Sequence, residues 1–320
     1  MKRTLAIITI IFMSLSITAC SYFTKENDDQ SPFQNAFDNT LDEKISYSKD
    51  LSGYDKIELN LDLTVSDVKI DVSNDLQLKY DQAANRKELL ATVEYKEKGD
   101  TLIITFVNDK KVNIIAGSQT SKTQIMIPEG VEVKFDTNLD VGDMTINAKD
   151  ITFTEITSNS DVGDINLFAT KSQDQLSYIS ISSDVGDLNV SVDKGAKALE
   201  TIKLETNTGR IKTSLDGNYE EAITLTAHID VGDVKLESKG NFEKQVEIDV
   251  KSSVGDVTIS VPQNHEMSVK PSITEFTSSL DLEDIPFEKS KGEYLLDGNK
   301  SIFKIDLTVT VGDATILYAK

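Results

Sequence analysis

The chain has 320 residues, of which 54 are acidic and 33 basic, so its formal net charge is -21 at pH 7. This charge excludes nucleic acid as a natural partner and disfavours anionic lipid headgroups. The single cysteine excludes an internal disulfide and a cysteine-based zinc site, and we expect no cofactor and no bound metal.

The N-terminus has the layout of an export signal. Lys2 and Arg3 precede an apolar run from Leu5 to Ile17, and small residues then lead to Cys20. The tetrapeptide Ile-Thr-Ala-Cys at 17–20 resembles a bacterial lipobox, which implies cleavage before Cys20 and attachment of diacylglycerol to its sulfur. The sequence thus predicts a signal peptide at 1–19 and a lipoprotein held on the outer face of the bacterial cytoplasmic membrane.

Composition and periodicity divide the rest of the chain. Residues 20–45 are polar and aperiodic, which predicts a flexible tether. Residues 46–320 alternate apolar and polar side chains, the period of strands with one buried face. Within this body we expect an N-terminal β cap at 46–127, with a short helix at 85–91, regular repeats at 128–261, and an insertion followed by a last coil at 262–320.

The strongest internal signal is a repeated Asp-Val-Gly-Asp motif. Successive glycines are 21, 23, 23, 23 and 23 residues apart, and a further copy follows after 57 residues, while Thr64-Val65-Ser66-Asp67 is a degenerate early copy. The glycines are Gly142, Gly163, Gly186, Gly209, Gly232, Gly255 and Gly312, and all but Gly209 are followed by aspartate: Asp143, Asp164, Asp187, Asp233, Asp256 and Asp313.

Each motif lies between two short strand patterns, so one repeat should read strand, turn, strand, turn. Ile223 to Ala227 precedes one motif, for example, and Val234-Lys235-Leu236 follows it. A type II turn would place the glycine at positive φ, and the aspartates could accept bonds from the turn's own N–H groups. The motif is therefore interpreted as a corner.

Energetics favour stacking of the repeats. Ordering 23 residues costs on the order of 35 kcal/mol, whereas five or six buried aliphatic side chains return only about 1.5 to 3 kcal/mol each. A lone repeat cannot fold, so we predict an all-β, parallel β-solenoid with coils of about 22–23 residues. An antiparallel meander is the alternative.

Stacking would align the aspartates that follow the glycines in one row, and Asp140, Asp161, Asp184 and Asp230 in another. Turn N–H groups would cap these carboxylates, and Arg210 would supply a counter-charge between Asp187 and Asp233. Calcium bound by successive turns is the functional alternative.

A family resemblance rests on the Val-Gly-Asp corners, the phrases Ile125-Met126-Ile127-Pro128 and Ile259-Ser260-Val261-Pro262, and the terminal Val-Gly-Asp strand. Over about residues 46–320 these resemble the bacterial adhesin-like family of β-strand-repeat lipoproteins, which is related to the β-repeat domain of Lia-type envelope-stress proteins. The resemblance implies a β-solenoid on the cell envelope, in a family with no agreed biochemical activity.

A non-catalytic binding, adhesin-like or envelope-stress module is the function that the sequence favours. Its partners would be the membrane, through the diacylglycerol on Cys20, and a cell-wall polymer, a cationic peptide or an envelope protein. A purely structural envelope protein is one alternative, and a polysaccharide-acting β-helix enzyme is another. Against the enzyme, the aspartates recur at every coil, His228 is expected to face solvent, and His265 is expected in a loop after Pro262.

Overall fold

The computed structural model describes residues 41–108, 119–274, 277–283, 285–298 and 300–319. The expected signal peptide (1–19), Cys20 and the expected tether up to residue 40 lie outside the described residues. The first strand, β1, begins at Glu43, inside the stretch expected to form the tether. Among the described residues, no helix is both long enough and apolar enough to cross a membrane.

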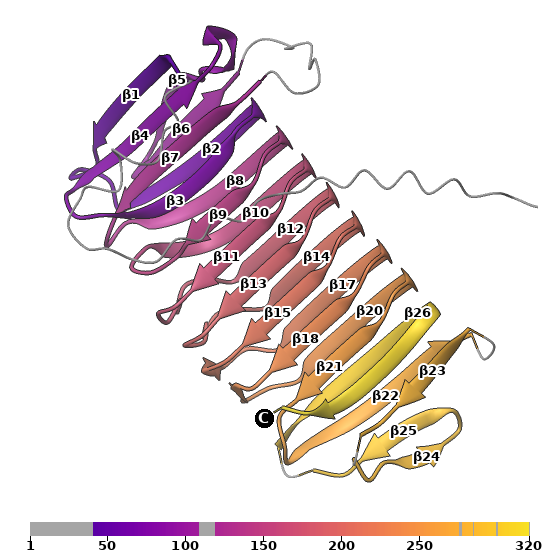
Figure 1. The fold of residues 1–320 in the computed structure, drawn as a ribbon. Helices are drawn as coiled ribbons and strands as arrows, with labels where there is room; N and C mark the ends of the chain where they lie inside the picture. The colour runs from indigo at the N-terminus through magenta and orange to yellow at the C-terminus, as the bar shows by residue number, and fades with distance from the viewer. Residues whose placement is uncertain (1–40, 109–118, 275–276, 284, 299, 320) are drawn as a thin grey trace, which may run out of the picture. The chain divides into compact units, whose positions relative to one another are not determined.

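The chain folds as a β-solenoid in which parallel strands from successive coils pair in register (Figure 1). The expected fold class is thereby confirmed, and the antiparallel meander is wrong for the repeats. In each repeat, one strand leads into the corner and a second strand leaves it. We call the two resulting surfaces the pre-corner sheet and the post-corner sheet.

The pre-corner sheet contains the longer strand of each coil. Its side chains alternate between the interior and solvent, as in β17, because a strand directs successive side chains to opposite faces. In order along the stack, its strands are β6 (Thr101–Val107), β2 (Lys56–Val65), β8 (Glu132–Val141), β10 (Thr152–Val162), β12 (Tyr178–Val185), β14 (Thr201–Thr208), β17 (Ile223–Val231), β20 (Val246–Val254), the first part of β26 (Lys300–Tyr318) and β22 (His265–Ile273).

The post-corner sheet contains the shorter strand that follows each corner. Its inward residues are aliphatic, as with Val234 and Leu236 of β18. In order along the stack, its strands are β7 (Ser121–Pro128), β3 (Asp67–Ser73), β9 (Met144–Asn147), β11 (Ile165–Ala169), β13 (Leu188–Val192), β15 (Ile211–Leu215), β18 (Val234–Ser238), β21 (Val257–Val261), the second part of β26 and β23 (Ser278–Asp281).

Chain order and stack order differ at both ends. The coil made by β2 and β3 lies between the coil of β6 and β7 and the coil of β8 and β9. Likewise β26, the last strand in the sequence, lies between the β20/β21 coil and strands β22 and β23. Residues 262–298 therefore supply the outermost strands at the C-terminal end of the stack.

Antiparallel strands cover the outermost parallel strands β6, β7 and β22, which limits edge-to-edge pairing between molecules, whereas β23 pairs only with β26 among the described residues. At the N-terminal end, β4 (Gln77–Ala84) pairs with β7, β1 (Glu43–Asp50) pairs with β4, and β5 (Thr92–Lys98) pairs with β6. At the C-terminal end, β25 (Glu293–Leu296) pairs with β22, and β24 (Glu288–Ser290) pairs with β25. The helix expected at 85–91 is reduced to a 3-10 turn, η1 (Lys87–Leu89).

The interior is one continuous hydrophobic cluster that extends through the coils. On a third side of two coils, the short strands β16 (Asn218–Tyr219) and β19 (Asn241–Phe242) pair in parallel. The rings of Tyr219 and Phe242 stack there with centroids 4.8 Å apart. Each coil thus contributes inward side chains to a core that it shares with its neighbours.

Candidate functional site

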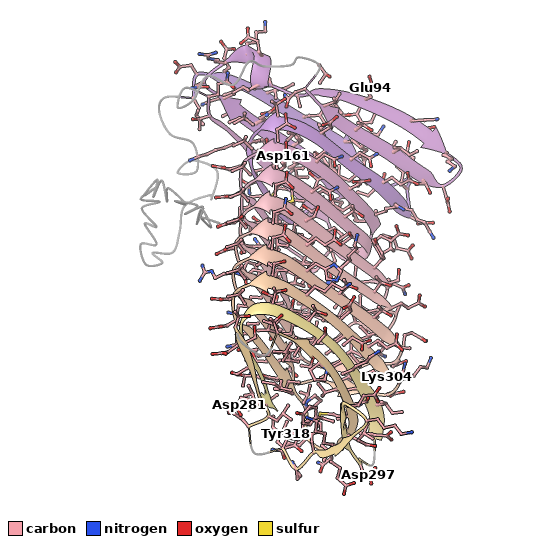
Figure 2. The ribbon with its side chains drawn as sticks, turned by 90° about the vertical axis from the view of Figure 1, so that its right-hand side faces the viewer. Glu94, Asp161, Asp281, Asp297, Lys304 and Tyr318 are labelled. Atoms are coloured by element: carbon pink, nitrogen blue, oxygen red, sulfur yellow. The ribbon has the colours of Figure 1, made fainter. Side chains whose placement is uncertain are left out.

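The seven motif glycines lie directly over one another at the corners of the stack. The N–H of each glycine from Gly142 to Gly255 donates to the carbonyl of the residue that precedes the next glycine, at 2.8–3.1 Å. Figure 2, in which Asp161 is labelled, shows the corners of successive coils one above another. We call this line of backbone the glycine ladder.

The conformation of these glycines differs from the expected type II turn. A type II turn needs φ near about +80°, whereas φ is 132–153° at all of them except Gly186. A Cβ added at any of the seven would lie 1.7–2.2 Å from the carbonyl oxygen of the residue stacked beneath it. Glycine is therefore required by the close approach of neighbouring coils as well as by positive φ.

The carboxylates after the glycines are capped by the neighbouring coil rather than by their own turn. The N–H of Asp187, for example, donates to Oδ1 of Asp164 at 2.8 Å. Bonds of 2.8–3.3 Å link the equivalent pairs, which are Asp143 to Asp67, Asp164 to Asp143, Asp256 to Asp233 and Asp313 to Asp256. This row is consequently part of the hydrogen-bonding between coils.

Arg210 interrupts this row as the sequence predicted. Its Nε and Nη2 both donate to Oδ2 of Asp187, at 3.0 and 2.5 Å. The Asp187 carboxylate raises the pKa of Arg210, so the guanidinium stays charged. Arg210 therefore neutralises one carboxylate in the middle of the stack.

Several of the stacked carboxylates ionise less readily than free aspartate. Burial raises the pKa of Asp164 most, the Asp187 N–H opposes that rise, and the charges of Asp143 and Asp187 add to it. Burial also raises the pKa of Asp67 and of Asp140, where charge repulsion from Asp161 contributes as well. Burial first, and repulsion between stacked carboxylates second, therefore disfavour ionisation at these positions.

A row of exposed valines lies beside the glycine ladder. The alternation of the preceding strand would turn each valine inward, but the corner turns it to solvent. The members that are 41–49% exposed, which we call the valine ridge, are Val162, Val185, Val231, Val254 and Val311. Before the valines lies the second aspartate row, whose members Asp140, Asp161, Asp184 and Asp230 are all exposed.

Aspartates flank Val162, Val185 and Val231 on both sides, whereas Ser253 and Thr310 precede Val254 and Val311. Asn207, Thr208 and Arg210 replace aspartate, valine and aspartate in one coil, so this coil divides the ridge into two segments. Sequence reasoning found the glycines and aspartates but did not single out the valines. The signal was available, because each valine follows an outward-facing polar residue, directly precedes the corner glycine and therefore sits beside the turn.

The two histidines do not meet. His228 is partly exposed on the pre-corner sheet, with Nε2 3.3 Å from Asp249 and Nδ1 3.7 Å from Glu205. His265 was expected in a loop, but it begins β22 and is 1% exposed, with its ring 5.1 Å from that of Phe303. Across the described ranges, no group of three or more His, Cys, Asp or Glu side chains could hold a metal ion.

A β-solenoid with a periodic corner of stacked glycines, aspartates and exposed valines defines a solenoid repeat protein. The family model described as Toastrack DUF4097 matches residues 54–317, and the chain belongs to this family. No curated protein matches the chain.

Solved structures with distant similarity carry names of binding proteins. A candidate cell adhesion protein from Clostridium sporogenes is 12% identical, with a TM-score of 0.38 over 86% of this chain and 99% of that one. A candidate adhesin from Bacteroides fragilis is 13% identical, with a TM-score of 0.30 over 87% and 98%. A candidate lipid-binding protein from Parabacteroides distasonis is 13% identical, with a TM-score of 0.29 over 87% and 97%.

Proposed function

We propose that the protein is an exported, lipid-anchored and non-catalytic binding module of the bacterial envelope, whose valine ridge binds a cationic amphipathic segment. That segment is a cationic peptide or a basic stretch of another envelope protein. The export signal and lipobox around Cys20 support the location. The observation that carries the binding role is the row of exposed valines, which has carboxylates along one side throughout and on both sides at Val162, Val185 and Val231.

The ridge offers apolar contact and negative charge at a fixed spacing. Adjacent coils are about 4.8 Å apart, so one valine recurs at each step within each segment of the ridge, which are Val162 with Val185 and Val231 with Val254 and Val311. A helix advances about 5.4 Å per turn, so an amphipathic helix can match several consecutive valines while its basic residues reach the flanking aspartates. Electrostatic attraction would speed the encounter, and buried valine surface would hold the complex.

The same carboxylates also support a structural role. Because Oδ1 of Asp164 and its counterparts accept N–H groups of the next coil, the row after the glycines contributes to the fold without any ligand. Asp161 and Asp184 in the other row are fully outward, and they are the charges that a cationic partner would meet. A purely structural envelope protein is therefore the second candidate.

Titration with a cationic amphipathic helix of leucine and lysine, followed by calorimetry, tests the binding role. Replacing Val185, Val231 and Val254 by threonine, which occupies the equivalent position 208 naturally, should weaken binding at least about tenfold. The matched control is Leu295→Thr, which removes an exposed apolar side chain away from the ridge. Equal affinity of the two variants, or no saturable binding to the wild type, would leave the structural role.

An envelope-stress role would appear in cells. Deletion of the gene should increase sensitivity to cationic antimicrobial peptides, because the module would no longer bind them at the membrane surface. Complementation with the wild type should restore resistance, whereas complementation with the triple valine variant should not. If both the wild type and the triple valine variant restored resistance, any stress role would not depend on the valine ridge.

A further inference from the structure

A depression of about 360 Å³ lies on the outer face of the post-corner sheet, where β13, β15 and β18 run side by side. It is located where Arg210 replaces the aspartate of the other corners. Its polar lining consists of Asp187, Asn189, Arg210, Lys212, Asp233 and Lys235. Three of these side chains are cationic, on a chain whose net charge is -21.

Lys212 and Lys235 are direct neighbours in the sheet. They pair in register between β15 and β18, so their backbones are about 4.8 Å apart and both side chains are exposed on the same face. Within the part of the chain that the structure describes, neither lysine forms an ion pair. Two adjacent like charges repel each other, and an anion bound between them would remove that repulsion.

These two lysines stand between uncharged neighbours in their column, whose other charged members are Asp281 and Lys69, the latter paired with Asp71. The equivalent outward residues on the adjoining coils are uncharged, namely Thr145, Asn166, Asn189, Thr258 and Thr315. Lys212 follows Arg210 by two residues. The coil in which Arg210 replaces the corner aspartate therefore carries two cations, Arg210 and Lys212. The basic group is therefore confined to one place in the stack.

Arg210 has donors available for a ligand. Two of its five N–H groups reach Oδ2 of Asp187, and its side chain is 70% exposed. That pairing holds the guanidinium at the edge of the depression. The remaining N–H groups of the planar guanidinium do not bond to Asp187.

The lining also contains acceptors that suit hydroxyl groups. Oδ2 of Asp187 accepts from Arg210, and Oδ1 of Asp233 accepts the N–H of Asp256, so each carboxylate has a second oxygen outside these bonds. Asn189 donates through Nδ2 to Asn166 at 3.2 Å, which leaves its Oδ1 as an acceptor. Three cations against two carboxylates give one net positive charge, which suits a monoanion and disfavours a dianion.

We infer that this depression binds a hydroxylated monoanionic unit of a glycopolymer. The anionic group lies between Lys212 and Lys235, Arg210 contacts its edge, and hydroxyls donate to Asn189 and the two carboxylates. A uronic acid residue and a polyol phosphodiester unit share this chemistry. The site is separate from the valine ridge, so its ligand does not compete for the ridge valines.

Calorimetry on the full chain tests this site with three probes at equal concentration: a galacturonic acid tetramer, a glycerol phosphate oligomer and a neutral glucose tetramer. We expect saturable binding of at least one anionic probe and none of the neutral one. The double variant Lys212→Gln with Lys235→Gln should weaken binding at least about tenfold for each lysine removed. Binding of the uronate alone, the phosphodiester alone, or both identifies the source and supports the site.

The matched control is Lys203→Gln, which removes an exposed lysine from β14 on the pre-corner sheet. It should bind the anionic probe as the wild type does, and circular dichroism should show unchanged melting for all variants. If Lys203→Gln weakened binding of the anionic probe as much as the double variant, the effect would come from the total charge of the protein and the proposed site would be wrong. Absence of binding by both anionic probes, or equal binding of the neutral probe, would overturn it as well.

Discussion

Replacing Gly232 by alanine tests why glycine is required at the corners, because both the positive φ and the close approach of the neighbouring coil apply there. Its φ of +135° disfavours any L side chain, and the added Cβ would lie 1.7 Å from the carbonyl oxygen of Gly209. Relief requires the coils to move apart. That movement weakens the two bonds that join these coils at the corner, from the Gly209 N–H to the Val231 carbonyl at 3.1 Å and from the Ile211 N–H to the Asp233 carbonyl at 3.0 Å.

The expected loss for Gly232→Ala is about 2–6 kcal/mol. Two weakened backbone bonds account for about 0.5–1.5 kcal/mol each, and the backbone strain adds about 1–3 kcal/mol. Gly186→Ala isolates the steric part, because Gly186 is not in the left-handed region and yet its Cβ would lie 2.0 Å from Gly163 O. Gly130→Ala isolates the conformational part, since φ is +85° and nothing lies within 4 Å.

Urea unfolding of the three purified variants, followed by circular dichroism, measures these losses. Gly232→Ala should be the least stable, and Gly186→Ala should lose stability through its contact alone. If Gly186→Ala were as stable as the wild type, neighbouring corners would not approach as closely as the structure shows. If Gly130→Ala were as damaging as Gly232→Ala, conformational preference alone would explain the corner glycines.

Three further substitutions test the core and the aspartate row. Burial raises the folded-state pKa of Asp164 above 3.8, so its protonation stabilises the fold fully below pH 3.8, and that gain is lost as pH rises through the folded pKa. Asp164→Asn, which keeps the Oδ1 acceptor, should therefore raise the Tm at pH 7 and flatten the dependence of Tm on pH in this range. An unchanged dependence of Tm on pH would contradict the electrostatic cost of this carboxylate. Thr213→Val should stabilise the fold by about 1 kcal/mol, because the buried Oγ1 of Thr213 has no hydrogen-bond partner among the described residues. The control Thr206→Val should destabilise the fold by about as much, because the Oγ1 of Thr206 donates to the carbonyl of Gly186. Phe242→Ala should cost about 3–5 kcal/mol in urea unfolding, since its buried ring stacks on Tyr219 and meets the ring of Phe303, and a loss below 1 kcal/mol would contradict that packing.

Much of the fold could be predicted because the repeat length and the position of glycine are local signals. A coil of 23 residues that cannot fold alone must stack, and stacking in register brings every corner over its neighbour. The pairing of Arg210 with Asp187 followed from the same register. These conclusions needed only the sequence and the energetic requirement for a shared core.

The order of the terminal coils could not be predicted. Chain order suggested that β2 and β3 would lie at the end, whereas the β6/β7 coil lies outside them. Similarly, the sequence predicted an insertion followed by a last coil at 262–320, whereas β22 and β23 from that insertion lie outside the coil of Gly312. Strands that are equivalent in pattern compete for the same neighbour, and only the complete packing decides between them.

Details of the site were missed because they depend on the neighbouring coil. The sequence of one corner suggests a turn closed by its own N–H groups, but the donor to Asp164 comes from Asp187, 23 residues later. The burial of His265 depends on Phe303, which is distant in sequence. The exposure of Val185 likewise follows from the direction of the corner, which alternation alone does not give.

Distances between paired spin labels test the stacked corners most directly. With Cys20 replaced by serine, labels at Val162 and Val254 should be about 19 Å apart, because four coil steps of about 4.8 Å separate them in the register. Labels at Val162 and Val311 should be only about one further step apart, near 24 Å, although 57 more residues lie between them. If moving the second label from 254 to 311 left the distance unchanged or increased it by several steps, the corners would not form a single ladder.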